Sequence, residues 1–368
     1  MRLPIIFFGC VLLLTSCIGR KSIQEELILG EWEFVKETWP TAYAMRLPAY
    51  KDGYRFINNG RCEVKRGFFS RNVLDDHQSS KYLGNETSYK IDGDSLMILN
   101  LTDKKWEAKK IAGITKDTLT FLVHDSVLIT YARLKPPIQA LSFDQVIVAA
   151  SGCYGTCPID QISIKRNGSV HYYGERYTSA IGIYESQISH LKFDQIATDF
   201  NKSNLTVLEE KYAAGWSDDE EITVTLIKNN RIIKTVSDYG NKAPAPLNWA
   251  YTPVRYLYQQ LNLKRTSPTF ALRRVTFAAG NDRYQLPNST SFYLNLLLSD
   301  SKPVLKKIKT SYELKFKGDS TIDKIKTDGR FYRISYIDGK EELLDIGYNF
   351  LSENKLLKKF RPKTPYDE

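Results

Sequence analysis

The sequence predicts a mixed, β-rich fold in which an antiparallel β-barrel is followed by one or two α+β domains. Tyrosine dominates the aromatic residues, with 23 Tyr against 17 Phe and 5 Trp, and tyrosine is enriched in strands. Short segments of alternating apolar and polar residues recur along the chain, separated by Asn-Gly and Asp-Gly turns. Helical spacing of apolar residues is absent from residues 27–134 and appears only later. A chain of 368 residues is long enough for two or three compact units.

The N-terminus has the pattern of a secreted, lipid-anchored protein. Arg2 precedes an apolar stretch over residues 3–14, which is too short for a permanent membrane-spanning helix but suits a signal peptide. The stretch ends in Leu-Thr-Ser-Cys17, which resembles the lipobox of bacterial lipoproteins. The resemblance implies a signal peptide over residues 1–16, acyl chains such as palmitate on Cys17, and a tether over residues 17–26. An ordinary secretory signal is the alternative.

The residue after Cys17 helps to predict whether the lipid anchor lies in the inner or the outer membrane. Many lipoproteins that stay at the inner membrane carry an aspartate there, whereas this chain has Ile18. We therefore expect attachment to the outer membrane, with the folded part facing the periplasm. Two or more acyl chains are enough for stable anchoring.

The first domain, residues 27–134, is expected to be a barrel of short strands. A Gly30-Glu-Trp32 strand, hairpins near Gly60 and Gly93, and a closing Arg133 resemble the lipocalin-like domains of Bacteroidota lipoproteins. The resemblance implies that Trp32 closes the barrel floor and that Arg133 stacks over it as a cation on an aromatic ring. A barrel of this size either holds a small apolar ligand or is filled by its own side chains, and both alternatives remain open. Cys62 is expected to be a buried small hydrophobe rather than a reactive thiol.

The second domain, residues 137–264, begins after Pro136-Pro137, which breaks the preceding strand. Its predicted order of strands, helix, strands and helix is typical of an α+β domain. Residues 184–201 and 247–261 have helical spacing of apolar residues, and Asn167-Gly168 predicts a type I′ hairpin.

The most distinctive motif lies at the start of this domain. Cys153-Tyr-Gly-Thr-Cys157-Pro158, with the hairpin that follows, resembles a C-x-G-x-C-P domain of unknown function that is common in Bacteroidota lipoproteins. Asp160 departs from the family, whose members often have an aromatic or aliphatic residue there. No activity is assigned to this family, so the resemblance identifies a domain but predicts no reaction.

Cys153 and Cys157 admit three interpretations. A local disulfide is favoured in an oxidising envelope, and closing so short a loop stabilises a fold by roughly 2 kcal/mol. The alternatives are a redox-active thiol pair and a copper site with His171 or His190, because soft thiolates bind Cu(I). In copper chaperones this spacing sits on a strand-to-helix turn, whereas here a strand and hairpin follow, which favours the disulfide.

Charge excludes some functions and leaves others open. The net charge is +10, but Lys and Arg alternate with Asp and Glu, so no basic stripe predicts nucleic-acid binding. Residues 216–221, WSDDEE, lack the spacing and glycine of a calcium loop and predict a solvated strand entrance.

The C-terminal region, residues 266–368, is expected to be a small α+β unit that packs on the second domain. Alternating segments lie between Gly-Asp and Asp-Gly turns, and Ser289 or Ser291 is a candidate N-cap for a helix through Leu298. A last helix is predicted over residues 351–360.

No catalytic motif occurs, and four histidines do not define a triad. We therefore expect an envelope lipoprotein that acts as a non-catalytic binding or interaction module, with neither a cofactor nor a metal. Its partners would be the membrane through Cys17, a small apolar ligand in the barrel or an envelope protein, and no nucleic acid. The alternative function is a thiol redox or copper-handling protein that uses Cys153 and Cys157.

Overall fold

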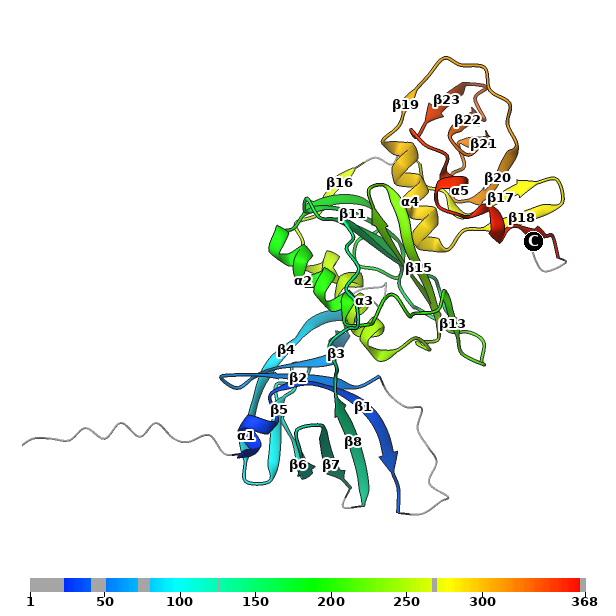
Figure 1. Ribbon diagram of the computed structural model, residues 1–368. Helices are drawn as coiled ribbons and strands as arrows, with labels where there is room; N and C mark the ends of the chain where they lie inside the picture. Colours follow the sequence, from blue (N-terminus) through cyan, green and yellow to red (C-terminus); the bar gives the residue numbers. More distant parts are fainter. Residues whose placement is uncertain (1–22, 41–50, 72–79, 125, 267–269, 365–368) are drawn as a thin grey trace, which may run out of the picture.

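The structure is a computed structural model that describes residues 23–40, 51–71, 80–124, 126–266 and 270–364. Within these residues the strands form a closed eight-stranded barrel and two further sheets of eight strands each. Figure 1 shows the barrel, the central sheet and the C-terminal sheet following one another in chain order. The predicted fold class, a β-rich chain with an antiparallel barrel followed by α+β parts, is confirmed.

The barrel is an up-and-down meander in which each strand pairs with the next and the last strand pairs with the first. Its strands are β1 Gly30–Thr38, β2 Gly53–Ile57, β3 Arg61–Arg71, β4 Ser80–Asp92, β5 Ser95–Leu99, β6 Trp106–Ile114, β7 Thr118–Val123 and β8 Val127–Arg133. Alternation along each strand sends one set of side chains inward.

The interior of the barrel contains a packed group of aromatic rings. Tyr54 lies with its ring centroid 5.6 Å from that of Phe56 and 5.3 Å from that of Tyr131. Phe121 packs against Tyr131 at 5.7 Å, and all four rings are buried. Offset and edge-on pairs of this kind stabilise a core beyond simple burial. The barrel therefore has a core made of its own side chains.

One end of the barrel is closed by Trp32 and Arg133. The Trp32 indole is fully buried and donates from Nε1 to the carbonyl of Ile28 at 2.7 Å. The Arg133 guanidinium lies 4.2 Å from the centroid of the Trp32 ring and donates to the carbonyls of Leu27 and Leu29. Gly30 adopts a φ of 117°, and a Cβ at this position would overlap the Arg133 side chain, so the approach requires glycine.

The segment before the barrel differs from the predicted tether over residues 17–26. Helix α1, Ile23–Leu27, covers the closed end of the barrel, and Ile28 is fully buried beneath it. The chain therefore becomes part of the folded domain at Ile23 rather than after residue 26. Burial of Ile28 and the Arg133 hydrogen bonds provide the stabilisation that a five-residue helix lacks by itself.

The central sheet has the strand order β13-β15-β14-β9-β10-β11-β12-β16 and is antiparallel except for the pair β13 and β15. Its strands are β9 Gln145–Ala150, β10 Ile159–Lys165, β11 Ser169–Arg176, β12 Gly182–Gln187, β13 Lys211–Ala213, β14 Glu221–Lys228, β15 Arg231–Tyr239 and β16 Lys264–Thr266. β9 is buried along its whole length because helices cover both faces of the sheet.

The two faces of the central sheet have different covers. Helices α2, His190–Asn201, and α3, Ala245–Arg255, pack on one face, and the 3₁₀ helix η1, Leu257–Gln260, continues α3. Helix α4, Asn288–Ser299, comes from the C-terminal region and packs on the other face, where Ile147 belongs to its core. Figure 1 shows α2 and α3 on the barrel side of the sheet and α4 on the far side.

Two local predictions in this domain are corrected by the structure. Residues 182–187 form strand β12 rather than the start of a helix, because they pair with β11 and β16, and Ser189 then caps α2 by accepting from Lys192 N. The turn at Asn167-Gly168 is not type I′. Only Gly168 has a left-handed φ, and three residues separate Lys165 from Ser169, which makes a loop closed by a glycine bulge.

The C-terminal sheet has the order β19-β23-β22-β21-β20-β17-β18-β24. Its strands are β17 Arg273–Ala279, β18 Asp282–Gln285, β19 Lys302–Pro303, β20 Tyr312–Lys317, β21 Ile322–Thr327, β22 Phe331–Tyr336, β23 Glu341–Asp345 and β24 Arg361–Pro362. The predicted last helix over residues 351–360 is interrupted. Helix α5, Phe350–Glu353, and the 3₁₀ helix η2, Leu357–Lys359, are separated at Asn354-Lys355, where Lys355 has a φ of 58°.

Helix α4 joins the C-terminal region to the central sheet. Its N-cap is Pro287, not Ser289 or Ser291, which are both buried. Ser289 and Thr290 instead make hydroxyl contacts with Thr225 of β14, at 2.8 and 3.0 Å. The C-terminal region thus shares a core with the central sheet. Neither serine caps the helix, because the Ser289 hydroxyl pairs with Thr225 across the interface and the Ser291 hydroxyl is buried without a hydrogen-bond partner among the described residues.

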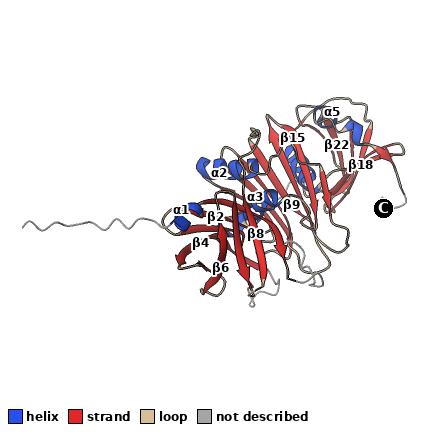
Figure 2. Ribbon diagram, turned by 60° about the horizontal axis from the view of Figure 1, so that its bottom comes forward, coloured by secondary structure: helices blue, strands red, loops and turns tan. Residues whose placement is uncertain are grey.

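The barrel packs against the helices of the central domain (Figure 2). Trp249 of α3 donates from Nε1 to the carbonyl of Lys51 at 2.7 Å, and a Cβ on Gly53 would overlap the Trp249 ring. Gln259 accepts from Tyr82 N at 2.8 Å. No described helix is both long enough and apolar enough to cross a membrane.

Candidate functional site

The candidate site is built on the loop between β9 and β10. Cys153 and Cys157 form a disulfide with their Cα atoms 5.6 Å apart. The disulfide closes residues 153–157 into a compact turn, and we call residues 151–158 the disulfide loop. Tyr154 projects from this loop with 89% of its surface exposed.

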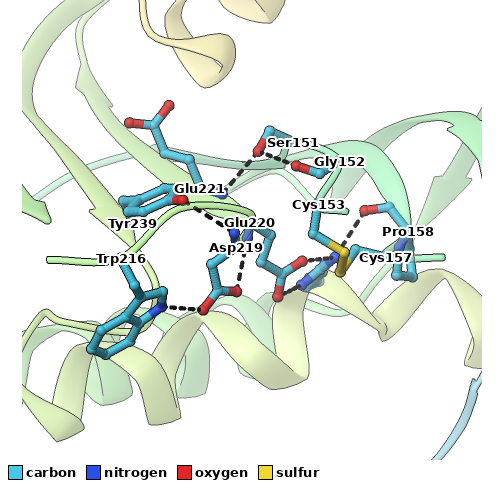
Figure 3. Close-up of a disulfide and its surroundings, with 11 residues drawn as sticks. Ser151, Gly152, Cys153, Cys157, Pro158, Trp216, Asp219, Glu220, Glu221 and Tyr239 are labelled. Carbon is cyan, nitrogen blue, oxygen red and sulfur yellow. Dashed lines mark hydrogen bonds and ion pairs between the residues drawn. A yellow bond between two sulfur atoms is a disulfide. The ribbon is translucent and has the colours of Figure 1, made fainter. Parts of the chain in front are cut away.

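A second loop lies against the first. Residues 216–220, which we call the acidic loop, lead into β14. Tyr154 N donates to Asp218 O at 3.0 Å, and Ser151 Oγ accepts from Glu221 N at 2.8 Å. Figure 3 shows the two loops side by side, with Glu220 and the disulfide facing each other. Together the loops form one projection, which we call the tip.

The acidic loop adds an exposed indole and carboxylates to the tip. Trp216 is 54% exposed, and its Nε1 donates to Asp219 Oδ2 at 3.1 Å. Asp219 N in turn donates to the Tyr239 hydroxyl at 3.1 Å, which holds the loop to β15. Asp218 is exposed. The tip therefore presents aromatic and acidic groups on a backbone that is fixed at several points.

A buried arginine lies beneath the tip. Arg255, the last residue of α3, donates from Nη1 to Glu220 Oε1 at 2.9 Å and from Nη2 to Pro158 O at 2.9 Å. Its Nε lies 3.5 Å from Asp160 Oδ1, and Arg255 and Asp160 are both almost fully buried. One guanidinium thus connects the disulfide loop, the acidic loop and β10. Its place at the C-terminal end of a helix also favours a cation there.

The electrostatics of this cluster are set by burial and by the paired charges. Burial raises the pKa of Asp160 to about 6, although Arg255 opposes the shift. For Arg255, burial alone would lower the pKa, but the carboxylates of Glu220 and Asp160 raise it well above its ordinary value. Arg255 is therefore always charged, and the cluster holds the two loops in place.

Sequence reasoning placed Glu220 wrongly and left the role of Asp160 open. The prediction of a solvated strand entrance holds for Asp218 but not for Glu220, which pairs with Arg255. The available signal at Asp160 was its departure from the domain that the motif from Cys153 to Pro158 resembles. Arg255 gave no signal, because its partners are 95 and 35 residues away along the chain.

The other residues singled out from the sequence lie away from the tip. Gly30, Trp32 and Arg133 come together at the closed end of the barrel. Cys62 is free and buried in the barrel, as expected, and burial raises the pKa of its thiol to about 12. Cys17, the expected lipid attachment site, lies outside the described residues.

Histidine positions bear on the copper alternative. His171 lies on β11 with its Nδ1 3.8 Å from Glu185 Oε1, and His190 is exposed at the start of α2. Burial lowers the pKa of His171. Among the residues that the structure describes, no three His, Cys, Asp or Glu side chains are grouped in a way that could hold a metal ion.

Comparison with known proteins identifies the domain that carries the tip. Residues 144–258 match the family described as a domain of unknown function, DUF6438. The match begins just before β9 and ends within η1, so the DUF6438 domain contains both loops of the tip and Arg255. The barrel and the C-terminal sheet lie outside it.

Other comparisons add no function. No curated protein matches the chain. Among solved structures, the crystal structure of BamB from Moraxella catarrhalis aligns over 85% of this chain and 88% of that chain, at 9% identity and a TM-score of 0.12. A similarity this low gives no information on the fold or function of the chain.

Proposed function

We propose that this chain is a lipid-anchored lipoprotein of the cell envelope that acts as a non-catalytic interaction module for an envelope protein. The apolar stretch over residues 3–14, followed directly by Ser16-Cys17, supports attachment through Cys17 at the outer membrane, with the folded domains in the periplasm.

The tip of the DUF6438 domain is the surface by which we expect the partner to bind. The observation that carries this proposal is the exposure of Tyr154 and Trp216 on loops held by a disulfide and by Arg255. Tyrosine and tryptophan are enriched in protein interfaces, and ordering the loops in advance reduces the entropy lost on binding. Both features favour recognition.

The charge of the tip indicates the chemistry of the partner. Asp218 and Asp219 leave the acidic loop negative around the exposed Trp216. Complementary charge steers association and favours one partner over others. The partner is therefore expected to be a protein that presents basic side chains next to an apolar contact.

The contents of the barrel favour a protein partner over a small apolar ligand. Tyr54, Phe56, Phe121 and Tyr131 already occupy the interior, and an apolar ligand would have to displace at least some of these rings. Close-packed interiors resist such displacement.

The redox or copper alternative would use Cys153 and Cys157. Hydrogen bonds attach the disulfide loop to the acidic loop, to the start of β14 and to Arg255. These contacts restrict the change of conformation that cycling between thiol and disulfide forms would require. His171 lies on β11 opposite Glu185 of β12, and its Nδ1 is 3.8 Å from Glu185 Oε1. These contacts favour a structural disulfide.

Photocrosslinking in living cells tests the proposal. A photoreactive amino acid replaces Tyr154 in one strain and Ile337, which is 70% exposed in the turn after β22, in a control strain. We expect a discrete adduct with one envelope protein at position 154 only, and we expect Asp218→Lys to weaken it at least tenfold. Absence of an adduct at 154, or the same adduct at both positions, would overturn the proposed docking surface.

A further inference from the structure

A polar cleft lies between the central sheet and the C-terminal sheet. Its volume is about 240 Å³, which is room for about eight water molecules. One wall comes from β10, β11 and the start of the disulfide loop, and the other from β17, β20 and α4. The residues that carry the argument are Gln161, Glu175, Arg273, Arg274, Asn288 and Lys317.

A bulge in β17 brings two consecutive arginines to this cleft. Neighbouring residues of a regular strand point to opposite faces. The pairing of β17 with β20 shifts between Arg273 and Thr276, and Arg274 has a left-handed φ of 49°. Such a conformation is rare for a residue other than glycine, and bulges commonly redirect side chains at sites of function. Both arginines line the cleft as a result.

The cleft has an excess of positive charge. Arg273, Arg274 and Lys317 face a single carboxylate, that of Glu175, an excess of two positive charges. Glu175 pairs with Arg273 across the cleft. In the part of the chain that the structure describes, the side chains of Arg274 and Lys317 have neither a hydrogen bond nor an ion pair. They are available to an anion.

Two buried polar atoms in the wall lack partners. Gln161 is only 8% exposed, and its amide oxygen has no hydrogen-bond partner. The Nε of Arg273 is also buried without a partner. Buried polar groups are nearly always paired, so the unpaired amide oxygen of Gln161, a residue that lines the cleft, indicates the place of a ligand group.

Helix α4 adds to the attraction for an anion. Asn288, its first residue, lines the cleft, and Pro287 at the N-cap provides no side-chain cap. The N-terminal end of a helix carries partial positive charge and favours anionic groups.

We propose that this cleft binds a small oxyanion that also carries hydroxyl groups, the chemistry shared by sugar acids and sugar phosphates. The carboxylate or phosphate contacts Arg274 and Lys317 near the start of α4. A ligand hydroxyl donates to the amide oxygen of Gln161, and a second donates to Glu175. This site is distinct from the tip and does not depend on the proposed protein partner.

Calorimetry on the full-length chain in detergent tests the proposal with four probes. Glucuronate and glucose 6-phosphate distinguish a carboxylate from a phosphate source, glucose lacks the anion, and sulfate lacks the hydroxyl donor. We expect one site per chain for glucuronate or glucose 6-phosphate, and no heat of binding for glucose. Arg274→Ala and Lys317→Ala should each weaken binding about tenfold or more, whereas Arg61→Ala on the barrel should leave it unchanged.

A second variant separates the two ends of the ligand. Gln161→Met keeps the volume of the side chain but removes the acceptor, so it should weaken binding of the hydroxylated anions and leave binding of sulfate unchanged. Absence of binding by both glucuronate and glucose 6-phosphate at 1 mM would overturn the proposal. Equal affinities in Arg274→Ala, Lys317→Ala and Arg61→Ala would also do so, provided that thermal unfolding shows all three variants to be folded.

Discussion

Arg255 Nε lies 3.5 Å from Asp160 Oδ1, and both side chains are nearly excluded from solvent beneath the disulfide loop. The same guanidinium binds Glu220 and the carbonyl of Pro158, so it connects parts of the chain that are remote in sequence. Removing one partner of a buried ion pair strongly destabilises the folded protein, because the other charge is left buried and unpaired. This holds even where the intact pair adds little net stability. The shape of the tip therefore depends on it.

Asp160 should make the stability of the protein depend on pH. Because burial raises the folded pKa from 3.8 to about 6, protonation favours the folded state. The stabilisation is complete below the unfolded pKa and is lost as the pH rises through about 6. It amounts to on the order of 3 kcal/mol. Asp160→Asn should lack this part of the pH dependence in urea unfolding between pH 4 and 7, and identical profiles would contradict the assignment.

Removing the cation should leave the buried carboxylate of Asp160 and the partly buried carboxylate of Glu220 without their positive partner. We expect Arg255→Met to lower the free energy of unfolding by about 3–5 kcal/mol. Arg61→Met is the matched control, since the Arg61 side chain is 63% exposed and its ion pair with Glu86 should contribute about 1 kcal/mol or less. Similar losses in urea unfolding of the two variants would show that Arg255 has no special role.

The disulfide should stabilise the tip modestly and should not exchange readily. Replacing both Cys153 and Cys157 by serine should cost about 2 kcal/mol, the chain entropy of so short a loop. Thiol labelling and metal analysis of the native protein provide the independent check. We expect neither free thiol at these positions nor bound copper, whereas stoichiometric copper or rapid reduction and reoxidation would favour the redox alternative.

Contact between the barrel and the DUF6438 domain should depend on Gly53. A Cβ at this position would overlap the Trp249 ring, so Gly53→Ala should displace the indole and cost about 1–3 kcal/mol. The change should appear in urea unfolding and in the tryptophan fluorescence. Gly113→Ala is the control, since nothing lies within 4 Å of a Cβ there. If both variants lost the same free energy of unfolding, the loss would come from replacing glycine in a strand and not from the contact between the domains.

Cys17 should determine the attachment of the protein to the membrane. We expect Cys17→Ser to abolish incorporation of labelled palmitate and to shift the protein from the membrane fraction to the soluble fraction of the envelope. A variant that remains in the membrane fraction, or that retains the label, would contradict the lipoprotein assignment.

The sequence by itself determined the features that depend on neighbouring residues. Alternation and Asn-Gly turns predicted the barrel strands, and both residues of Asn59-Gly60 adopt the left-handed φ that a tight turn requires. The motif from Cys153 to Pro158 predicted a domain of unknown function, and residues 144–258, which contain this motif, match DUF6438. The apolar stretch before Cys17 predicted an anchor.

Only the tertiary structure decided the features that depend on how the sheets pack. Residues 182–187 form a strand because they pair with β11 on one side and with β16 on the other. The packing of α3 brings Arg255 to Asp160 and Glu220. Gln161 and Arg274, which belong to different sheets, line the same cleft. Local propensity extends over a few residues, whereas a buried charge cluster or a cleft is set by contacts between distant segments.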